Sequence, residues 1–361
     1  MGVFPTATER RPLSRRTIAL AGLLPLGLAS GLIAMMTGPA SSASPRVCPS
    51  QSGHEAVLTT AMPGRPGPLL RVGRTLWVAI RSQRPFGAGQ LLRVDARTGR
   101  IERRFPLTGS ADRLVFAFGS LWIPEEVSRR RGGSAIFRLD PRTGRVQDVI
   151  RGPRLGTALA ATADALWVGG ADFFPAGHPE RSWVYWVYKI DPKRGGVVHR
   201  VRLRSTVIDL VGDGRSLWVT GWYAIVKLAD SGRVLLRQPL RGAAWSISLA
   251  ADGAWVAHTF AGTRKDRRPP PERRLLRIHE RARPHITVLE LDKSPWAVSA
   301  AGEVTWAALG DSSHEVLRVD ESQSPLATAR AEVPGIVTDV EAGPGGAWVA
   351  HTHRNGVTKV C

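Results

Sequence analysis

Four side chains of this 361-residue sequence combine a type that metal binding or acid–base chemistry requires with a position that could bring them together, namely Glu125, His258, His351 and His353. Carboxylates and imidazoles are the usual oxygen and nitrogen ligands of zinc, and they are also the commonest general acids and bases. In an extended strand, the two imidazoles of His351 and His353 would lie on one side, about 6–7 Å apart. With the neighbouring Glu126, these residues form a candidate site for a divalent metal or an acid–base pair.

The alternative is that these side chains are polar residues at a rim, bonded to the backbone or to water. Glu125, His258 and His351 each follow a Trp by three residues. If these Trp residues mark repeats arranged in a ring, as argued below, the three residues hold equivalent positions near the mouth of its central channel. The sequence contains no nucleophile elbow, phosphate-binding Gly loop or zinc-spaced Cys cluster. No cofactor is predicted, a divalent metal is left open, and no catalytic residue is assigned.

A second candidate site is the basic segment 264–274, which could hold an anionic polymer or could be a solvated loop. Its cationic residues are Arg264, Lys265, Arg267, Arg268, Arg273 and Arg274. The formal net charge of the chain is +20, but the basic residues are spread over the whole sequence. No nucleic-acid-binding module accompanies this charge, so nucleic acid is not a predicted partner.

The elements that must position these residues repeat along the chain. Each unit contains Leu-Trp-Val-Ala or a variant of it, four continue through a loop to Arg-Val-Asp or a variant, and the first two of these end in a Thr-Gly turn. The recurring tryptophans are Trp77, Trp122, Trp167, Trp218, Trp255, Trp306 and Trp348. Repeats of about 40–50 residues with several short strands each are typical of propeller blades. The sequence therefore predicts an all-β, seven-bladed β-propeller over residues 48–361, with strands near 68–73, 75–81, 90–96 and 101–107 in the first blade.

The last repeat stops at Cys361, before a fourth strand. Residues 54–62 form an unassigned apolar segment before the first blade, and placing it as that fourth strand closes the ring without exposed edges. Cys48 and Cys361 are the only two cysteines, and this closure brings them near each other, which predicts a disulfide. The loops between second and third strands then share one face, the predicted binding face.

Residues 1–43 have the features of an export segment. Arg-Arg-Pro-Leu-Ser-Arg-Arg is followed by an apolar run over 17–36 and by small residues up to Ala43. This pattern predicts a signal peptide of twin-arginine type, while 20 apolar residues are also just long enough for an uncleaved membrane anchor. In either case the propeller is expected outside the cytoplasm, secreted or anchored.

The repeated Gly-X-Leu-Trp-Val and Arg-Ile-Asp-Pro-X-Thr-Gly patterns resemble those of exported bacterial propellers of the YncE-like and NHL-like kind, and more distantly streptogramin B (virginiamycin B) lyase. The lyase resemblance implies a magnesium ion and a catalytic His after Pro at the start of inner strands. Here Trp296 stands at that position, and Val337 and Thr338 occupy its counterpart in the last blade. The lyase activity is therefore not carried over.

The function expected from the sequence is non-enzymatic binding of a protein, peptide or cell-envelope polymer on the loop face, by a monomer. The alternative is a metal-dependent lyase or hydrolase that uses Glu125, His258, His351 and His353.

Overall fold

The computed structural model describes residues 56–82, 87–127, 133–152, 155–173, 183–260, 271–280, 285–310, 312–323 and 326–361. The predicted export segment 1–43 and Cys48 lie outside these ranges, so the signal, the anchor and the disulfide stay predictions. Within the described ranges, the structure has no helix with the length and apolarity needed to cross a membrane.

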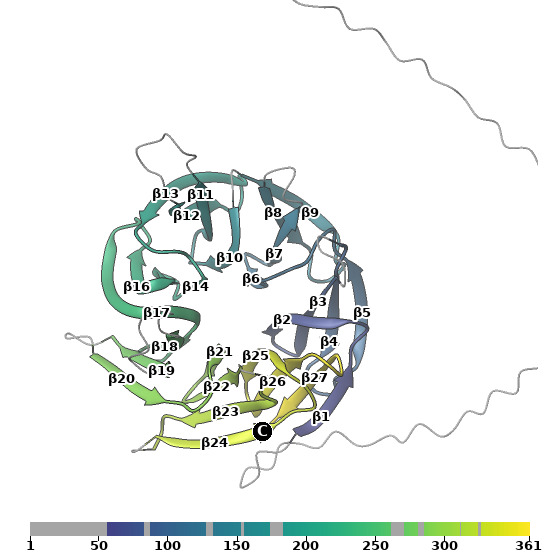
Figure 1. Cartoon of the computed structure of the whole chain (residues 1–361). Coiled ribbons are helices and arrows are strands. Elements are labelled where there is room, and N and C mark those ends of the chain that lie inside the picture. The colour runs from purple at the N-terminus through teal and green to yellow at the C-terminus, as the bar shows by residue number, and fades with distance from the viewer. Residues whose placement is uncertain are drawn as a thin grey trace, which may run out of the picture. The chain divides into compact units, whose positions relative to one another are not determined.

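The described chain is all β and forms a seven-bladed propeller, as the sequence predicts (Figure 1). The strands are β1 (Ala56–Ala61), β2 (Arg65–Val72), β3 (Thr75–Arg81), β4 (Gln90–Asp95), β5 (Ile101–Pro106), β6 (Val115–Ala117), β7 (Ser120–Val127), β8 (Gly133–Leu139), β9 (Val146–Arg151), β10 (Leu155–Ala161), β11 (Leu166–Phe173), β12 (Trp183–Asp191), β13 (Gly196–Leu203), β14 (Asp209–Gly212), β15 (Ser216–Thr220), β16 (Trp222–Ala229), β17 (Val234–Ala250), β18 (Gly253–Phe260), β19 (Glu272–His279), β20 (His285–Glu290), β21 (Pro295–Ala301), β22 (Val304–Leu309), β23 (Glu315–Asp320), β24 (Ala327–Glu332), β25 (Val337–Gly343), β26 (Gly346–His351) and β27 (Gly356–Val360).

Blades 1, 2, 3 and 6 are the antiparallel sheets β2–β5, β6–β9, β10–β13 and β21–β24. Blades 4 and 5 share one strand, because the 17-residue β17 pairs with β16 along its first part and with β18 along its second part. In Figure 1, β17 runs from the outside of the ring to its inside. The two blades are therefore joined by continuous strand instead of by a loop.

Blade 7 combines the two ends of the described chain. It contains β25, β26 and β27, and β1 pairs with β27 from Ala56↔Val360 to Ala61↔Gly356. This pairing supplies the fourth strand and confirms the predicted closure of the ring. It also removes two strand edges that would otherwise lack partners.

The recurring Trp residues fill the spaces between blades. Trp122, Trp167, Trp218 and Trp255 have no measurable exposure, and Trp77 packs with residues of blades 1 and 2. Because both faces of each sheet contact a neighbouring blade, the second strands are buried on both sides, whereas the outer fourth strands are largely exposed. These large aromatic side chains thus supply much of the buried apolar surface of the ring.

A cation lies opposite the recurring Trp in every blade, on the third strand. The register pairs each Trp in turn with Arg93, Arg138, Lys189, Lys227, Arg277, Arg318 and Lys359. In four blades the cation lies over the indole, 5.1–5.8 Å from the ring centroid. Part of the high positive charge is therefore explained by these cation–π contacts within blades.

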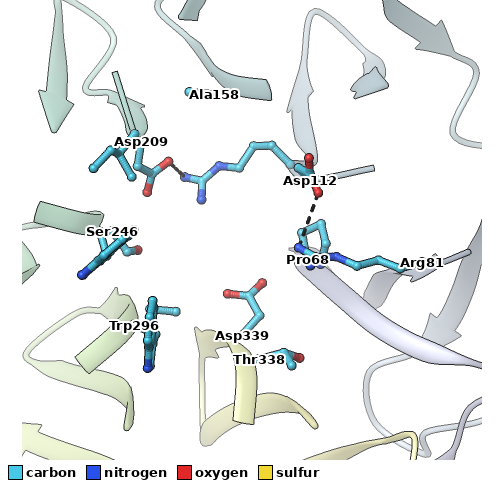
Figure 2. A pocket seen from close by; sticks show the side chains of 13 residues that line it. Pro68, Arg81, Asp112, Ala158, Asp209, Ser246, Trp296, Thr338 and Asp339 are labelled. Atoms are coloured by element: carbon cyan, nitrogen blue, oxygen red, sulfur yellow. Dashed lines mark ion pairs between the residues drawn. The ribbon is translucent and has the colours of Figure 1, made fainter. Parts of the chain in front are cut away.

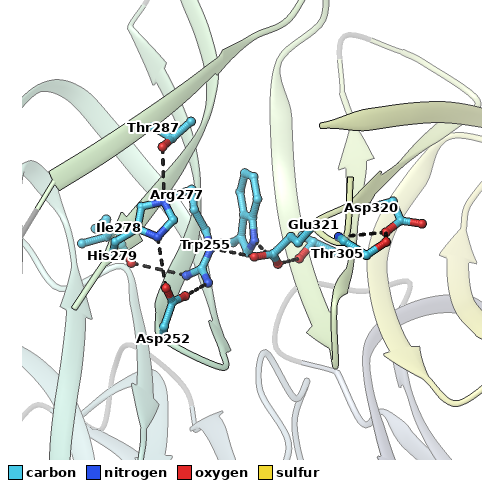
Figure 3. A network of polar contacts seen from close by, with 10 residues as sticks. Asp252, Trp255, Arg277, Ile278, His279, Thr287, Thr305, Asp320 and Glu321 are labelled. Atoms are coloured by element: carbon cyan, nitrogen blue, oxygen red, sulfur yellow. Dashed lines mark hydrogen bonds and ion pairs between the residues drawn. The ribbon is translucent and has the colours of Figure 1, made fainter. Parts of the chain in front are cut away.

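The most deeply buried of these cations, Arg277, connects blades 5 and 6 (Figure 3). Its guanidinium group pairs with Asp252, and its Nε lies 2.8 Å from Oε2 of Glu321. The indole of Trp255 donates to the other oxygen of Glu321 at 2.6 Å. The Arg277 side chain is only 4% exposed, so its charge depends on these partners for compensation.

Candidate functional site

The predicted metal or acid–base residues do not form a ring at the channel mouth. They lie on second strands or just after them, whereas the described residues that line the channel belong mainly to the first, inner strands and the segments before them. A second strand lies one strand away from the axis, so its side chains enter the spaces between blades. The structure therefore does not place these residues in the ring near the channel mouth that the sequence predicts.

Glu125 braces a connection between blades. Its Oε2 accepts hydrogen bonds from the hydroxyl of Thr108 at 2.5 Å and from the backbone N–H of Gly109 at 2.7 Å. Burial raises the pKa of this carboxyl, and these hydrogen bonds act in the opposite direction. Glu126 lies on β7 beside it, but the structure does not describe its side chain.

The three histidines do not form a common site. His258 is buried in blade 5, where its Nε2 donates to the carbonyl of Arg241 at 2.5 Å. His351 is buried in blade 7, with Nε2 2.9 Å from the hydroxyl of Thr358. Burial lowers the pKa of both imidazoles, which favours their neutral forms.

His353 is not on the same strand face as His351, contrary to the sequence expectation. The strand β26 ends at His351, and His353 lies in a turn with φ of 68°, exposed to solvent. The ring of His351 packs closely against the backbone of Gly335 and Gly356, where an added Cβ would lie 3.1 and 2.6 Å from it. Among the described residues, no group of three His, Cys, Asp or Glu side chains could hold a metal ion.

The basic segment is partly a strand. Arg273 and Arg274 belong to β19, and Arg274 pairs with Glu272 at 2.6 Å and with Glu290 at 2.7 Å. Arg264, Lys265, Arg267 and Arg268 lie outside the described residues. The anionic-polymer site therefore stays a prediction for those four residues.

The structure instead identifies a set of channel-lining residues that the sequence reasoning missed. They stand nine and seven residues before the recurring Trp of their blade. The strand register fixes these positions, because the residue seven before each Trp pairs with it across the first and second strands. In blade 7 these are Asp339 and Glu341, and in blade 4 the first of them is Asp209. Alignment of the repeats on their Trp was the signal that could have found them.

The polar members of this set join neighbouring blades at the axis. Six of them accept a hydrogen bond from a backbone N–H of the next inner strand, at distances of 2.7–3.3 Å. The pairs, acceptor first, are Asp209 and Ile247, Ser246 and Val298, Ser248 and Ala300, Ser299 and Ala342, Asp339 and Leu69, and Glu341 and Arg71. Inner-strand N–H groups without ladder partners are thereby satisfied.

The channel opens on the loop face, defined here as the face where first strands begin and second strands end. A cavity of about 220 Å³ lies at this opening, the channel mouth (Figure 2). Two ion pairs line it: Arg113 Nη2 lies 3.2 Å from Asp209 Oδ1, and Arg81 Nη2 lies 3.5 Å from Asp112 Oδ1. The carboxyl of Asp339 borders the same cavity.

The carboxyls of this channel resist ionisation. Burial, with repulsion from Asp209, raises the pKa of Asp339 to about 6. Burial, with repulsion from Asp339, raises the pKa of Glu341 to about 7. Burial also raises the pKa of Asp209, although Arg113 opposes that shift. The largest cause of all three shifts is burial, which favours the protonated form of these carboxyls.

Four aromatic rings lie in sequence beside the channel mouth and are called the aromatic row: Tyr223, Trp222, Trp245 and Trp296. Their successive ring centroids are 6.0, 6.0 and 5.0 Å apart. Tyr223 is 64%, Trp222 41% and Trp296 45% exposed. Trp245 and Trp296 also line the mouth cavity, so the row and the channel form one surface. These Trp residues lie outside the seven-fold repeat, which is the sequence signal for them.

The aromatic row is held in place by its surroundings. The backbone of Trp222 donates to Thr206 Oγ1 at 2.7 Å and accepts a hydrogen bond from Ser205. Tyr223 has φ of 71°, a conformation that costs a non-glycine residue energy and that clusters at functional sites. The indole of Trp245 donates to Thr259 at 2.7 Å. Rigid aromatic groups of this kind bind ligands with little loss of side-chain entropy.

Gly310 gives Trp296 its position, because a Cβ there would lie 1.4 Å from the indole Nε1. Gly310→Ala is expected to displace the ring of Trp296 while the propeller stays folded, which a shift in tryptophan fluorescence with unchanged circular dichroism would reveal. Gly196→Ala is the matched control, since nothing lies near the added methyl group. Equal fluorescence spectra for both variants would contradict this role of Gly310.

No family model and no curated protein matches the chain. Among solved structures, it is similar to the Pan2 WD40 domain of Neurospora crassa, with TM-score 0.64, 11% identity, and coverage of 84% of this chain and 93% of that one. A chain of a mitotic checkpoint complex matches with TM-score 0.65, 11% identity, and coverage of 92% and 99%. BamB of Moraxella catarrhalis matches with TM-score 0.50, 15% identity, and coverage of 80% and 82%.

These similarities define the class of the protein as β-propeller. At 11–15% identity they show the fold alone, and function has to be argued from the site.

Proposed function

We propose that this protein is an exported, non-enzymatic propeller that binds a protein, a peptide or a cell-envelope polymer on its loop face. The observation that carries this proposal is the aromatic row, which leaves three rings exposed at the edge of a charged channel mouth. Exposed Trp and Tyr clusters beside charged groups are typical of binding surfaces, where they act as anchors. The proposed export rests on the sequence of residues 1–43.

The rigid scaffold supports a binding function. Buried Trp residues pack between neighbouring blades, and hydrogen bonds at the axis also link blades 4, 5, 6, 7 and 1 in turn, so the loop face has little need to rearrange on binding. The metal-dependent alternative has no specific observation in its favour, since Glu125, His258 and His351 each serve local contacts in different blades.

The test is a selection of ligands followed by comparison of variants. A displayed library of random heptapeptides and a set of soluble peptidoglycan fragments are offered to the purified chain and to Trp222→Ala/Trp296→Ala. We expect ligands whose affinity falls by about tenfold to a hundredfold in the double variant, as for a hot-spot aromatic pair.

The matched control is Val198→Ala, which removes an exposed apolar side chain from β13, on the outer edge of blade 3. It is expected to leave binding unchanged. Ligands that the double variant retains at full affinity, or the absence of any ligand from both collections, would contradict the proposal.

A further inference from the structure

The channel mouth has an excess of acidic groups. The described lining of the channel contains four carboxyls but only two guanidinium groups. The charged groups around it are Arg81 on β3, Asp112 and Arg113 before β6, Asp209 on β14, Asp339 and Glu341 on β25, and Arg71 on β2 beside Glu341. Asp112 and Asp209 are paired with the arginines, whereas Asp339 makes no direct ion pair among the described residues and is attracted by Arg113 only from a longer distance.

The carboxyl of Asp339 makes no direct ion pair among the described residues. It accepts hydrogen bonds from the backbone N–H groups of Leu69, at 2.7 Å, and Val340. Figure 2 shows its carboxyl and Trp296 bordering the same cavity. A cation placed there would meet a carboxylate on one side and an indole on the other. Carboxylate and indole together favour a cation over an anion or a neutral group.

From this juxtaposition we infer that the channel mouth accepts the basic side chain of a peptide ligand, an arginine or a lysine, between Asp339 and the rings of Trp245 and Trp296. The inference rests on the proposed binding function and names the chemistry of the partner. A cavity of about 220 Å³ has room for one such side chain but not for a folded segment.

A peptide fits the surface better than a free small cation does. Trp222 and Tyr223 extend the apolar surface away from the cavity, over blade 4, where only the remainder of a longer ligand could contact them. An extended peptide offers a charged group for the cavity and further side chains for these rings. The net charge of +20 does not prevent a cationic side chain from binding at the mouth, because charges farther away than about 8 Å are largely screened at physiological salt.

The raised pKa of Asp339, about 6, adds a dependence on pH. A bound cation stabilises the ionised carboxyl, so binding lowers its pKa and releases a proton when the solution is near pH 6. Binding is therefore expected to be strongest at pH 8 and to weaken as pH falls from 7 to 5.

The experiment uses three peptides, acetyl-Gly-Ser-Arg-Ser-Gly-amide and the same sequence with citrulline or with Glu in place of Arg. Citrulline keeps the shape of Arg without its charge. We expect the Arg peptide to bind at least tenfold more tightly than the citrulline peptide at pH 8, measured by calorimetry or tryptophan fluorescence. Agmatine, the free side-chain analogue, is expected to bind more weakly than the peptide because it lacks the main chain.

Asp339→Asn is expected to reduce the affinity for the Arg peptide at least tenfold and to leave the citrulline peptide unaffected. The control is Glu303→Gln, an exposed carboxyl in the turn between β21 and β22, which is expected to change nothing. Equal binding of the Arg and citrulline peptides, full affinity in Asp339→Asn, or no binding of the Arg peptide at millimolar concentration would overturn the inference. Neutral ligands that depend on Trp296 but not on Asp339 would leave the proposed function standing while this inference falls.

Discussion

Replacing Arg277 with Met is expected to lower the free energy of unfolding by about 3–5 kcal/mol, the usual cost of removing one partner from a buried ion pair. The methylene stem of Met still covers Trp255, so the loss comes mainly from Glu321, whose carboxylate is left without its guanidinium partner. That carboxyl is 16% exposed and cannot recover full hydration. Urea denaturation measures the difference.

Arg318→Met is the matched control for Arg277→Met. Arg318 occupies the same place in blade 6, opposite Trp306, but it is 27% exposed and pairs with Asp320 two residues away. A surface ion pair of this kind contributes at most about 1 kcal/mol. Equal losses in the two variants would show that burial of Arg277 is not what matters. A second variant, Arg277→Met/Glu321→Gln, should recover part of the stability because it removes the uncompensated charge.

Asp339→Asn/Glu341→Gln is expected to be more stable than the wild type at pH 8, by about 3 kcal/mol, and to lose the larger part of this advantage at pH 5. Both carboxyls have a higher pKa in the folded chain, about 6 and about 7, than their ordinary values of 3.8 and 4.5. They therefore take up protons on folding, so their contribution favours the folded state at low pH and is lost as pH rises through the folded values. The amides keep an acceptor for the N–H groups of Leu69 and Arg71. Denaturation with urea at pH 5 and pH 8 measures the difference in stability between the double variant and the wild type at each pH.

Asp140→Asn is expected to change the stability at pH 8 in the opposite direction. Hydrogen bonds from the backbone of Arg142 and Thr143 hold the pKa of Asp140 below its ordinary value, so its stabilising effect is present at neutral pH and disappears in acid. Its removal is expected to destabilise the chain at pH 8, in contrast to the double variant of Asp339 and Glu341. A difference between wild type and double variant that does not change with pH would contradict the assigned shifts.

The fold could be predicted because one large residue marks every repeat. A Trp at nearly regular spacing identifies seven units, and the missing last strand together with residues 54–62 determines the closure by β1. Backbone geometry near loops could not be predicted in the same way. His353 was expected to continue a strand, but the chain turns after His351 and adopts a positive φ at His353.

The site was harder to predict than the fold because distance from the axis is not visible in a repeat pattern. Glu125, His258 and His351 share a position relative to Trp, which indicates equivalence but not whether that position faces the channel. Asp339 and Glu341 do face it, one strand further in. Trp222, Trp245 and Trp296 break the repeat, but Trp186 breaks it as well and packs against the core, so irregular spacing alone does not identify the binding surface.

The continuous strand β17 also affects how the molecule can move. At a loop-connected junction, adjacent blades can separate slightly through local opening, the kind of low-energy fluctuation that amide exchange detects. Between blades 4 and 5 such opening would break strand pairing, because β17 is bonded to β16 and β18 alike. Trp222 begins β16 and pairs with Ala243, while Trp245 stands two residues further along β17. The centre of the aromatic row therefore rests on a junction that can open only by breaking strand pairing, and we expect its spacing to be kept.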